Sequence, residues 1–235
     1  MAERVKLAVA GIGNNVSALV QGVYYYRDLK LRQPDGELPG IRRPVIDGLG
    51  VDDLEFVAGF DITAAKVGQD INRAIFAEPN NSMRLAVELP VNGVIVEQGI
   101  DDADNDEQIG RVARALTTSG AEVLLYALPA GRQWAASAYA EAALRSGVAF
   151  INTTPDRVAR DPQMMERFAA AALPLIGDDI ASHFGTSVVH KTLLHLLAER
   201  GLTLVSSYQF NLGGNQDFLN LRDNASAKRQ SKLNA

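Results

Sequence analysis

Two glycines and a distant aspartate form the clearest candidate for chemistry in this sequence. Gly11 and Gly13 follow an apolar run and open a helical pattern. Gly11 permits a tight turn, and at Gly13 a ligand can approach the backbone because no Cβ atom stands in the way. The N–H groups and partial positive charge at the start of the helix favour phosphate oxygens. The pattern predicts a pyrophosphate-binding loop with cofactor contacts from Gly11, Gly13, Asn14, Asn15 and Val16.

Asp61 ends a second apolar run, Leu54–Phe60, where its carboxylate can accept hydrogen bonds from the adenosine ribose of a dinucleotide. A carboxylate repels a 2′-phosphate, so we expect NAD rather than NADP. Asp61 lies farther from Gly13 than the usual spacing of about 20 residues. The proline- and glycine-rich segment Leu31–Gly50 accounts for the excess. The alternative interpretation is an ordinary glycine turn followed by a solvated aspartate.

Lys228 and Lys232 form a second group with potential chemistry. Their spacing places both ammonium groups on one face of a helix, where side chains four positions apart are neighbours. Repulsion between the two charges lowers the pKa of at least one of them toward the range that is useful for proton transfer. In a polar segment such as Ala225–Ala235, the alternative interpretation is a pair of solvated charges.

Asp178 and Asp179 follow an apolar run, Leu173–Gly177, and so fall where open α/β sheets bind ligands. Hydroxyl groups and glycine amides at the start of the next helical pattern suit a phosphate monoester. These groups belong to Ser182, Gly185, Thr186 and Ser187. A solvated acidic turn and a common Ser/Thr helix cap are the alternative interpretations.

Short β-rich runs alternate with helical patterns along most of the chain, which predicts parallel βαβ units. We expect strands at Arg4–Ala10, Leu54–Phe60, Val91–Ile100, Ala121–Leu128, Val148–Asn152 and Leu173–Gly177, helices at Asn15–Lys30, Thr63–Phe76, after Gly131 up to Ser146 and at Gly185–Arg200, and an extended strand at Leu202–Asn211. The predicted fold is a Rossmann-type, doubly wound parallel α/β sheet over residues 1–184. Residues 185–235 are predicted to begin an α+β catalytic and oligomerisation domain.

Composition narrows the possible functions. The chain has 235 residues, of which 47% are hydrophobic, and its formal net charge is -5, so we expect neither a nucleic-acid nor a membrane partner. The absence of cysteine excludes a disulfide, a thiolate zinc site and a cysteine nucleophile. The three histidines lack the spacing of a helical zinc motif, so no metal is expected. Without a signal-peptide core or a membrane-spanning run, the expected location is cytoplasmic.

Several segments together resemble the myo-inositol-1-phosphate synthase family in its shorter bacterial and archaeal form. They are GIGNNVSALVQGVYYY (11–26), VAGFDITAAKVGQDINRAIFAEPNN (57–81), LLYALPAG (124–131), GVAFINTTP (147–155), GDDIASHFGTSVVH (177–190), NLGGNQDFLNL (211–221) and SAKRQSK (226–232). Because they follow the family's order over nearly the whole chain, the combination is more specific than the glycine loop alone.

The resemblance implies an NAD-dependent isomerisation of glucose 6-phosphate to inositol phosphate. In this family NAD oxidises the C5 hydroxyl, a proton leaves C6, the ring closes by aldol attack on C1, and the same NADH reduces the ketone. The resemblance also implies a homotetramer. It assigns catalytic roles to Asp179, Asp217, Lys228 and Lys232, substrate contacts to Ser182, Gly185, Thr186, Ser187 and Asn215, and further cofactor contacts to Leu128, Pro129 and Asp178.

Two departures from the family pattern bear on activity. Ala181 stands where the family usually carries a lysine, and the family continues beyond the position of Ala235, so we expect the second domain to be incomplete. Two other functions therefore stay open. A dehydrogenase of another small polar substrate would accumulate NADH, whereas a non-catalytic module would bind NAD without turnover.

Overall fold

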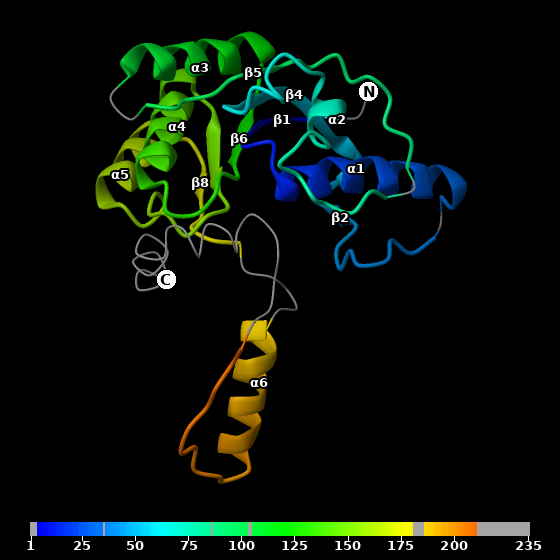
Figure 1. Ribbon diagram of the computed structural model, residues 1–235, viewed down its shortest axis with the longest axis vertical. Helices are drawn as coiled ribbons and strands as arrows, with labels where there is room; N and C mark the ends of the chain where they lie inside the picture. Colours follow the sequence, from blue (N-terminus) through cyan, green and yellow to red (C-terminus); the bar gives the residue numbers. More distant parts are fainter. Residues whose placement is uncertain (1–3, 35, 86, 103–104, 181–185, 211–235) are drawn as a thin grey trace.

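The computed structural model describes residues 4–34, 36–85, 87–102, 105–180 and 186–210 (Figure 1). Six strands form one parallel sheet in the order β5-β4-β1-β6-β7-β8. Their bounds are β1 Val5–Ala10, β4 Leu54–Asp61, β5 Val96–Gln98, β6 Val123–Tyr126, β7 Ala149–Asn152 and β8 Leu175–Ile176. The chain winds outward from β1 to β5 and then returns to the other side of β1. This strand order is that of a doubly wound dinucleotide-binding sheet, so the α/β fold prediction is confirmed.

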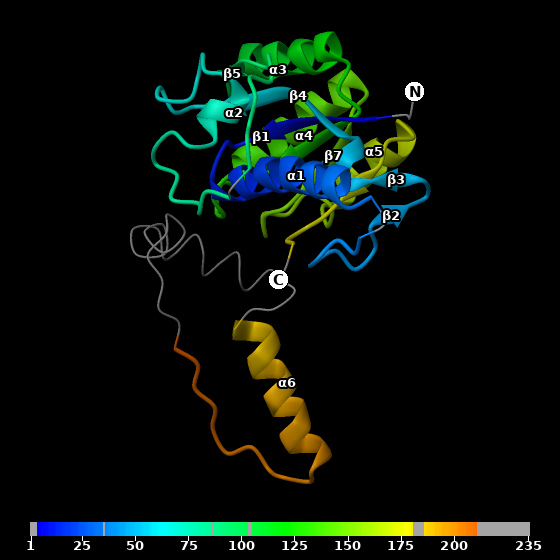
Figure 2. The same cartoon turned by 90° about the vertical axis from the view of Figure 1, so that its right-hand side faces the viewer.

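Helices cover both faces of the sheet (Figures 1 and 2). One face packs against α1 (Asn14–Arg32) and the short α2 (Ile71–Ala74), and the other against α3 (Asp106–Ser119), α4 (Gln133–Ser146) and α5 (Pro162–Ala170). Side chains of β1 alternate between these layers: Val9 belongs to the core under α1, and Ala10 to the core under α3 and α4. Parallel sheets need this two-sided burial.

A bulge in β4 changes its alternation. Leu7 pairs with Phe56 but Ala8 pairs with Ala58, so Val57 is opposite no residue of β1. As a result Phe56 packs in the core under α1, whereas Ala58 and Phe60 pack in the core under α3 and α4.

The crossover from β4 to β5 differs from the predicted helix Thr63–Phe76. Only the four residues of α2 are helical, and Asp70 caps them by accepting a hydrogen bond from the backbone N–H of Asn72. Gly68 has a φ of 85° and donates its N–H to the carbonyl of Val96 at 2.8 Å, which turns the chain away from a helical path. The predicted strand Val91–Ile100 is likewise reduced to β5.

Two smaller elements and the last described segment complete the chain. The loop-rich segment Leu31–Gly50 contains a short antiparallel hairpin of β2 (Val45–Ile46) and β3 (Leu49–Gly50). The helix predicted near residues 185–200 is α6 (Thr186–Glu199), but residues 202–210 are assigned to no strand, so that prediction is wrong for them. Asn211 and the rest of the predicted second domain lie outside the described residues.

Candidate functional site

The carboxyl ends of β1, β4 and β6 meet at Gly11. Its N–H donates to the carbonyl of Phe60 at 2.8 Å, and the N–H of Ala127 donates to the carbonyl of Ala10 at 2.9 Å. Gly11 has a φ of 89°, and a Cβ atom there would lie 2.9 Å from the carbonyl oxygen of Ala127. Only glycine satisfies both conditions, so the turn that leads out of β1 depends on this residue.

Gly13 occupies open space at the start of α1. A Cβ atom built on it would meet no other atom within 4 Å. Gly13 is also the N-cap of α1, and it has no side chain that could occupy the N–H groups of the first turn. These N–H groups and the helix dipole suit a phosphate, and the open space above Gly13 suits close approach of a pyrophosphate. The loop therefore fits a dinucleotide.

Asp61 is hydrogen-bonded to the same loop. Its Oδ2 atom accepts the N–H of Ile12 at 2.8 Å, and its Oδ1 atom accepts the N–H of Thr63 at 2.8 Å. The side chain is 9% exposed. A carboxylate has about four lone-pair positions, so two stay available for the ribose hydroxyls that we expect it to bind. Asp61 thus shapes the loop in addition to any contact with a cofactor.

Lys66 is a functional candidate that our sequence analysis missed. Its Nζ atom lies 3.9 Å from Asp61 Oδ2, and its side chain is 3% exposed. Burial lowers the pKa of Lys66, and the neighbouring Asp61 carboxylate partly offsets this effect. A lysine inside a predicted amphipathic helix looks like an ordinary solvated charge. Lys66 instead lies in a turn after β4, where its N–H donates to the carbonyl of Thr63, and its Nζ atom contacts the glycine loop at Ile12.

Asn14 and Val16 use their side chains within the protein. The Asn14 amide donates to Asn81 Oδ1 at 2.7 Å and accepts the N–H of Asn81 at 3.0 Å, while Ser82 donates its hydroxyl to the Asn14 carbonyl. Val16 is fully buried in the core under α1. The cofactor contacts predicted for these two residues are therefore left to their backbone N–H groups, whereas the Asn15 side chain is exposed.

The segment that follows β6 lies against Gly11. Leu128 is half-buried and reaches the turn at Gly11, since a Cβ atom on Gly11 would lie 3.0 Å from its Cδ1 atom. Pro129 is exposed. Farther along, the N–H of Gly131 donates to Asp156, a buried carboxylate whose pKa is raised above its usual value by desolvation. This bond ties the loop after β6 to the loop after β7.

Asp178 differs from our expectation of a cofactor contact. Its carboxylate is fully buried and accepts hydrogen bonds from the Asn152 amide at 2.7 Å and from the backbone N–H groups of Val158 and Ala159 at 3.1 and 3.0 Å. The Arg160 guanidinium lies 3.3 Å from the same carboxylate. The reason is electrostatic: a buried carboxylate requires several donors. Asp178 supplies the anchor for the turn after β7, and its side chain has no exposed surface for a cofactor.

Asp179 is exposed beside this anchor, at the carboxyl end of β8. Its φ is 70°, and its N–H donates to the carbonyl of Thr154 at 2.9 Å. The structure thus separates two adjacent acids that the sequence alone does not distinguish. The first is buried among several donors and the second is exposed, and the catalytic role predicted for Asp179 stays a prediction.

Most of the remaining predicted site residues lie outside the described residues. Those outside the described residues are Ser182, Gly185, Asn215, Asp217, Lys228 and Lys232, together with Ala181. Thr186 and Ser187 begin α6. Among the described residues, no group of three or more His, Asp or Glu side chains could hold a metal ion. Within the same part of the chain, no helix has the length and apolar character needed to cross a bilayer.

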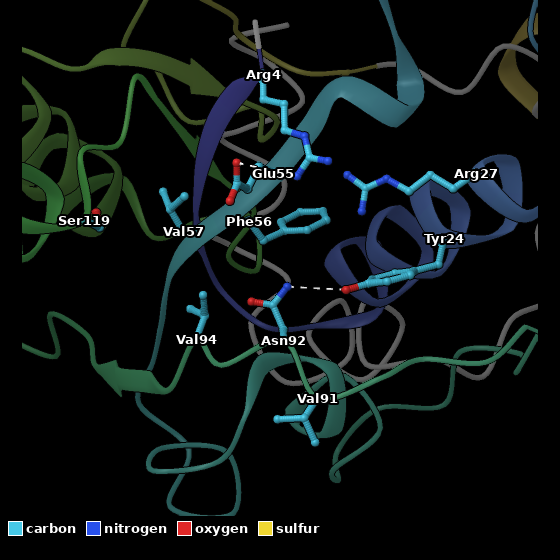
Figure 3. Close-up of a pocket in the computed structure, with 10 residues that line it drawn as sticks. All are labelled: Arg4, Tyr24, Arg27, Glu55, Phe56, Val57, Val91, Asn92, Val94 and Ser119. Atoms are coloured by element: carbon cyan, nitrogen blue, oxygen red, sulfur yellow. Dashed lines mark hydrogen bonds and ion pairs between the residues drawn. The ribbon is translucent and has the colours of Figure 1, made fainter. Parts of the chain in front are cut away.

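A cavity of about 420 Å³ lies elsewhere on the sheet domain (Figure 3). Its walls include Arg4 and Glu55, at the amino ends of β1 and β4, so it opens at the edge opposite Gly11. Arg27 faces into it, but its guanidinium donates to the backbone carbonyls of Asp52 and Leu54. The cavity is therefore separate from the predicted cofactor site.

Known proteins resemble this chain along its whole length. A family model described as "Myo-inositol-1-phosphate synthase" matches residues 185–235. The inositol-3-phosphate synthase of Mycolicibacterium smegmatis is 38% identical over 247 residues, which cover 100% of this chain and 67% of that protein. The synthase of Mycobacterium tuberculosis is 38% identical over 98% of this chain and 65% of its own length. The chain thus spans about two thirds of the length of these relatives.

Two solved structures share the fold. The crystal structure of Ari2 superposes with a TM-score of 0.89 and 55% identity, covering 94% of this chain and 68% of Ari2. A myo-inositol-1-phosphate synthase-related protein from Thermotoga maritima superposes with a TM-score of 0.66 and 24% identity, covering 98% of this chain and 68% of that protein. At that identity the second likeness bears on the fold alone.

Proposed function

The chain belongs to the myo-inositol-1-phosphate synthase family, and on that premise we propose that it supplies the NAD-binding part of an enzyme that isomerises glucose 6-phosphate to inositol phosphate. The observation that carries the proposal is the loop at the end of β1. Gly11 makes its turn, Gly13 leaves open space above it, and Asp61 holds it from the next strand. These features suit a pyrophosphate and an adenosine ribose.

NAD, when bound, would supply reversible hydride transfer at C5 of the sugar phosphate, so that no NADH would accumulate. The N–H groups at the start of α1 bind the pyrophosphate, and Asp61 selects NAD by repelling a 2′-phosphate. Exposed Asp179 is the described residue best placed to meet the substrate at the crevice. The proposal keeps Lys228, Lys232 and Asp217 as catalytic groups, and Ser182, Gly185, Thr186, Ser187 and Asn215 as substrate contacts.

We propose in addition that the chain assembles as a homotetramer. Apolar side chains on α6 and on the segment after it are exposed in the single chain: 55% for Leu193, 95% for Val205 and 69% for Phe210. Isolated large apolar side chains are ordinary, but a contiguous set of this kind is typical of surfaces that other chains cover. A monomer in light scattering at working concentration would contradict this assembly.

A second candidate is an NAD-linked dehydrogenase of another small polar substrate. One observation favours it: Ala181 stands where the resemblance places a lysine. Loss of a cation beside a phosphorylated sugar would change which substrate is held.

The test is incubation of the protein with glucose 6-phosphate and substoichiometric NAD, followed by phosphorus NMR and NADH absorbance together. A new phosphomonoester signal that matches inositol phosphate, without net NADH, supports the synthase. Net NADH formed when another small polar substrate replaces glucose 6-phosphate favours the second candidate, the dehydrogenase. Binding of NAD without turnover of any sugar phosphate would leave only the binding module.

A further inference from the structure

Lys66 makes its contacts directly beneath the glycine loop. Its ammonium group donates to the carbonyl oxygen of Ile12 at 2.8 Å and to Asn80 Oδ1 at 3.3 Å. Asn80 in turn donates its amide to the same Ile12 carbonyl at 3.1 Å. With Asp61 accepting the N–H of Ile12, both polar backbone atoms of this residue are held from inside the protein.

The hydrogen bonds to the Ile12 carbonyl also fix the orientation of the next peptide N–H, which belongs to Gly13. The Ile12 carbonyl and the Gly13 N–H belong to one planar trans peptide, so they point in opposite directions. Because Lys66 and Asn80 hold the carbonyl inward, the Gly13 N–H is turned outward. Gly13 is also the residue whose Cβ position meets no atom within 4 Å. The inward contact therefore aims a donor at the open space that suits a phosphate.

Burying an ammonium group so that it can donate to a carbonyl costs free energy, because desolvation opposes the charged form. The neutral side-chain amide of Asn80 donates to the same carbonyl without a charge. The charge of Lys66 becomes favourable when an anion lies on the other side of the loop, since Coulomb attraction acts across a few ångströms of poorly screened protein. Asp61, 3.9 Å away, already offsets part of the charge and keeps the pair close to neutral before a ligand binds.

We propose that Lys66 is a positioning residue for the cofactor pyrophosphate: it holds the Ile12 carbonyl inward and so directs the Gly13 N–H to the phosphate. This inference rests on the proposed NAD-binding function and deepens it. The role is distinct from that of Asp61, which fixes the preceding peptide and faces the ribose.

The test compares Lys66→Met with Lys30→Met. Both substitutions remove a lysine that is paired with an aspartate, but the Lys30–Asp52 pair lies at the far end of α1. The NAD dissociation constant is measured by calorimetry, and the unfolding temperature is measured without NAD. We expect NAD binding to weaken roughly tenfold in Lys66→Met, as for loss of one hydrogen bond from a charged group, and to stay within about twofold in Lys30→Met. The amide signal of Gly13 in ¹⁵N NMR should shift on NAD addition in the wild type and shift less in Lys66→Met.

Asn80→Ala keeps the test decisive if Lys66→Met does not fold. It removes the neutral donor and leaves Lys66 on the Ile12 carbonyl, so we expect a smaller loss of about threefold. Folded Lys66→Met with wild-type NAD affinity, even at a lowered unfolding temperature, would overturn the positioning role and leave NAD binding intact. If Lys66→Met does not fold, unchanged affinity in Asn80→Ala overturns it. A wild type that binds no NAD would reject the proposed function itself.

Discussion

The two faces of the sheet are held by different interactions. Under α3 and α4 the contacts are apolar, and the buried side of α4 consists of six alanines and Tyr139. The α1 face adds a long segment between α2 and β5 whose described residues form no regular structure, and amide side chains hold that segment by hydrogen bonds. Gln21 holds residues 83 and 85, and Asn72 holds Pro90. The glycine loop lies on this second face, and its own bonds to Asn80, Asn81 and Ser82 are of the same polar kind.

The difference shows that apolar packing and polar ties serve separate purposes here. Apolar helices fix the sheet without constraining any single backbone atom, because dispersion and burial are not directional. Hydrogen bonds from amide side chains fix individual carbonyl and N–H groups, which is what a loop needs in order to present donors to a phosphate. Substitutions on the first face should therefore change stability, and those near the loop should change binding.

The largest difference between an effect on NAD binding and an effect on stability is expected at Gly13, within the glycine loop. Gly13→Val places a side chain in open space, and its backbone, with φ of -92°, suits any residue. NAD binding should be abolished, because the side chain occupies the phosphate position, while stability falls by only about 1 kcal/mol, because valine is a poorer N-cap than glycine. Calorimetry and urea unfolding measure the two quantities. Gly11→Ala is the control with the larger expected loss of stability, since its Cβ atom meets the Ala127 carbonyl. Full NAD affinity in Gly13→Val would remove this loop from the cofactor site.

On the apolar face, Ala140→Leu should lower stability without a direct effect on the loop. Ala140 is fully buried in the core under α4. Three added heavy atoms must displace close-packed neighbours, at a cost of about 1–3 kcal/mol. Urea unfolding gives the cost, and the NAD dissociation constant of the folded variant should match the wild type. A large change in NAD affinity at unchanged stability would show that the two faces are coupled.

On the polar face, Gln21→Ala should act locally. Gln21 is 1% exposed and accepts the N–H of Leu85 at 2.8 Å, so the substitution leaves the half-buried N–H of Leu85 without this partner, at a cost of about 1 kcal/mol. Hydrogen exchange should speed up at residues 83–85 and stay slow in α3 and α4. Uniformly faster exchange throughout the sheet would contradict a local role.

The smallest effect is expected from Glu141, which joins α4 to α5 through Arg167 at the surface of the apolar face. Partial burial raises the pKa of Glu141, but hydrogen bonds from Arg145 and Arg167 outweigh burial and leave the pKa below its usual 4.5. The stabilising contribution is complete above pH 4.5 and is lost as pH falls through the lowered value in the folded protein. Glu141→Gln should therefore be less stable than wild type by under about 1 kcal/mol at pH 7 and equal to it in strong acid. A constant difference at all pH values would mean that charge plays no part.

Sequence patterns predicted the strands of this molecule better than its helices, because α3 and α5 were not among the helices expected. The six strands, α1 and α4 follow from hydrophobic runs and from the glycines that bound them, and Gly11, Gly13 and Asp61 do meet in space. The helix predicted at Thr63–Phe76 failed because Gly68 and Asp70 make specific bonds to β5 and its approach, and periodicity does not report such long-range partners. Lys66 was missed for the same reason.

The acidic pair after β8 shows a second limit. Asp178 and Asp179 are chemically identical neighbours, yet one is buried under several donors and the other is exposed. The choice depends on where Val158 and Ala159 lie, 20 residues away in the sequence. No local pattern contains that information, whereas the carboxyl-edge position of both residues follows from the topology alone.

The bulge at Val57 bears on how the length of β4 can vary. In a regular strand, deletion of one residue exchanges the faces of every side chain on one side of the deletion. Val57 is opposite no residue of β1, so a chain without it would keep Phe56 against Leu7 and Ala58 against Ala8. Asp61 would still end the strand beside Ile12. β4 thus contains one residue, Val57, that can be removed without a change in the pairing of the others. Relatives can gain or lose a residue there while Asp61 keeps its position at the end of the strand.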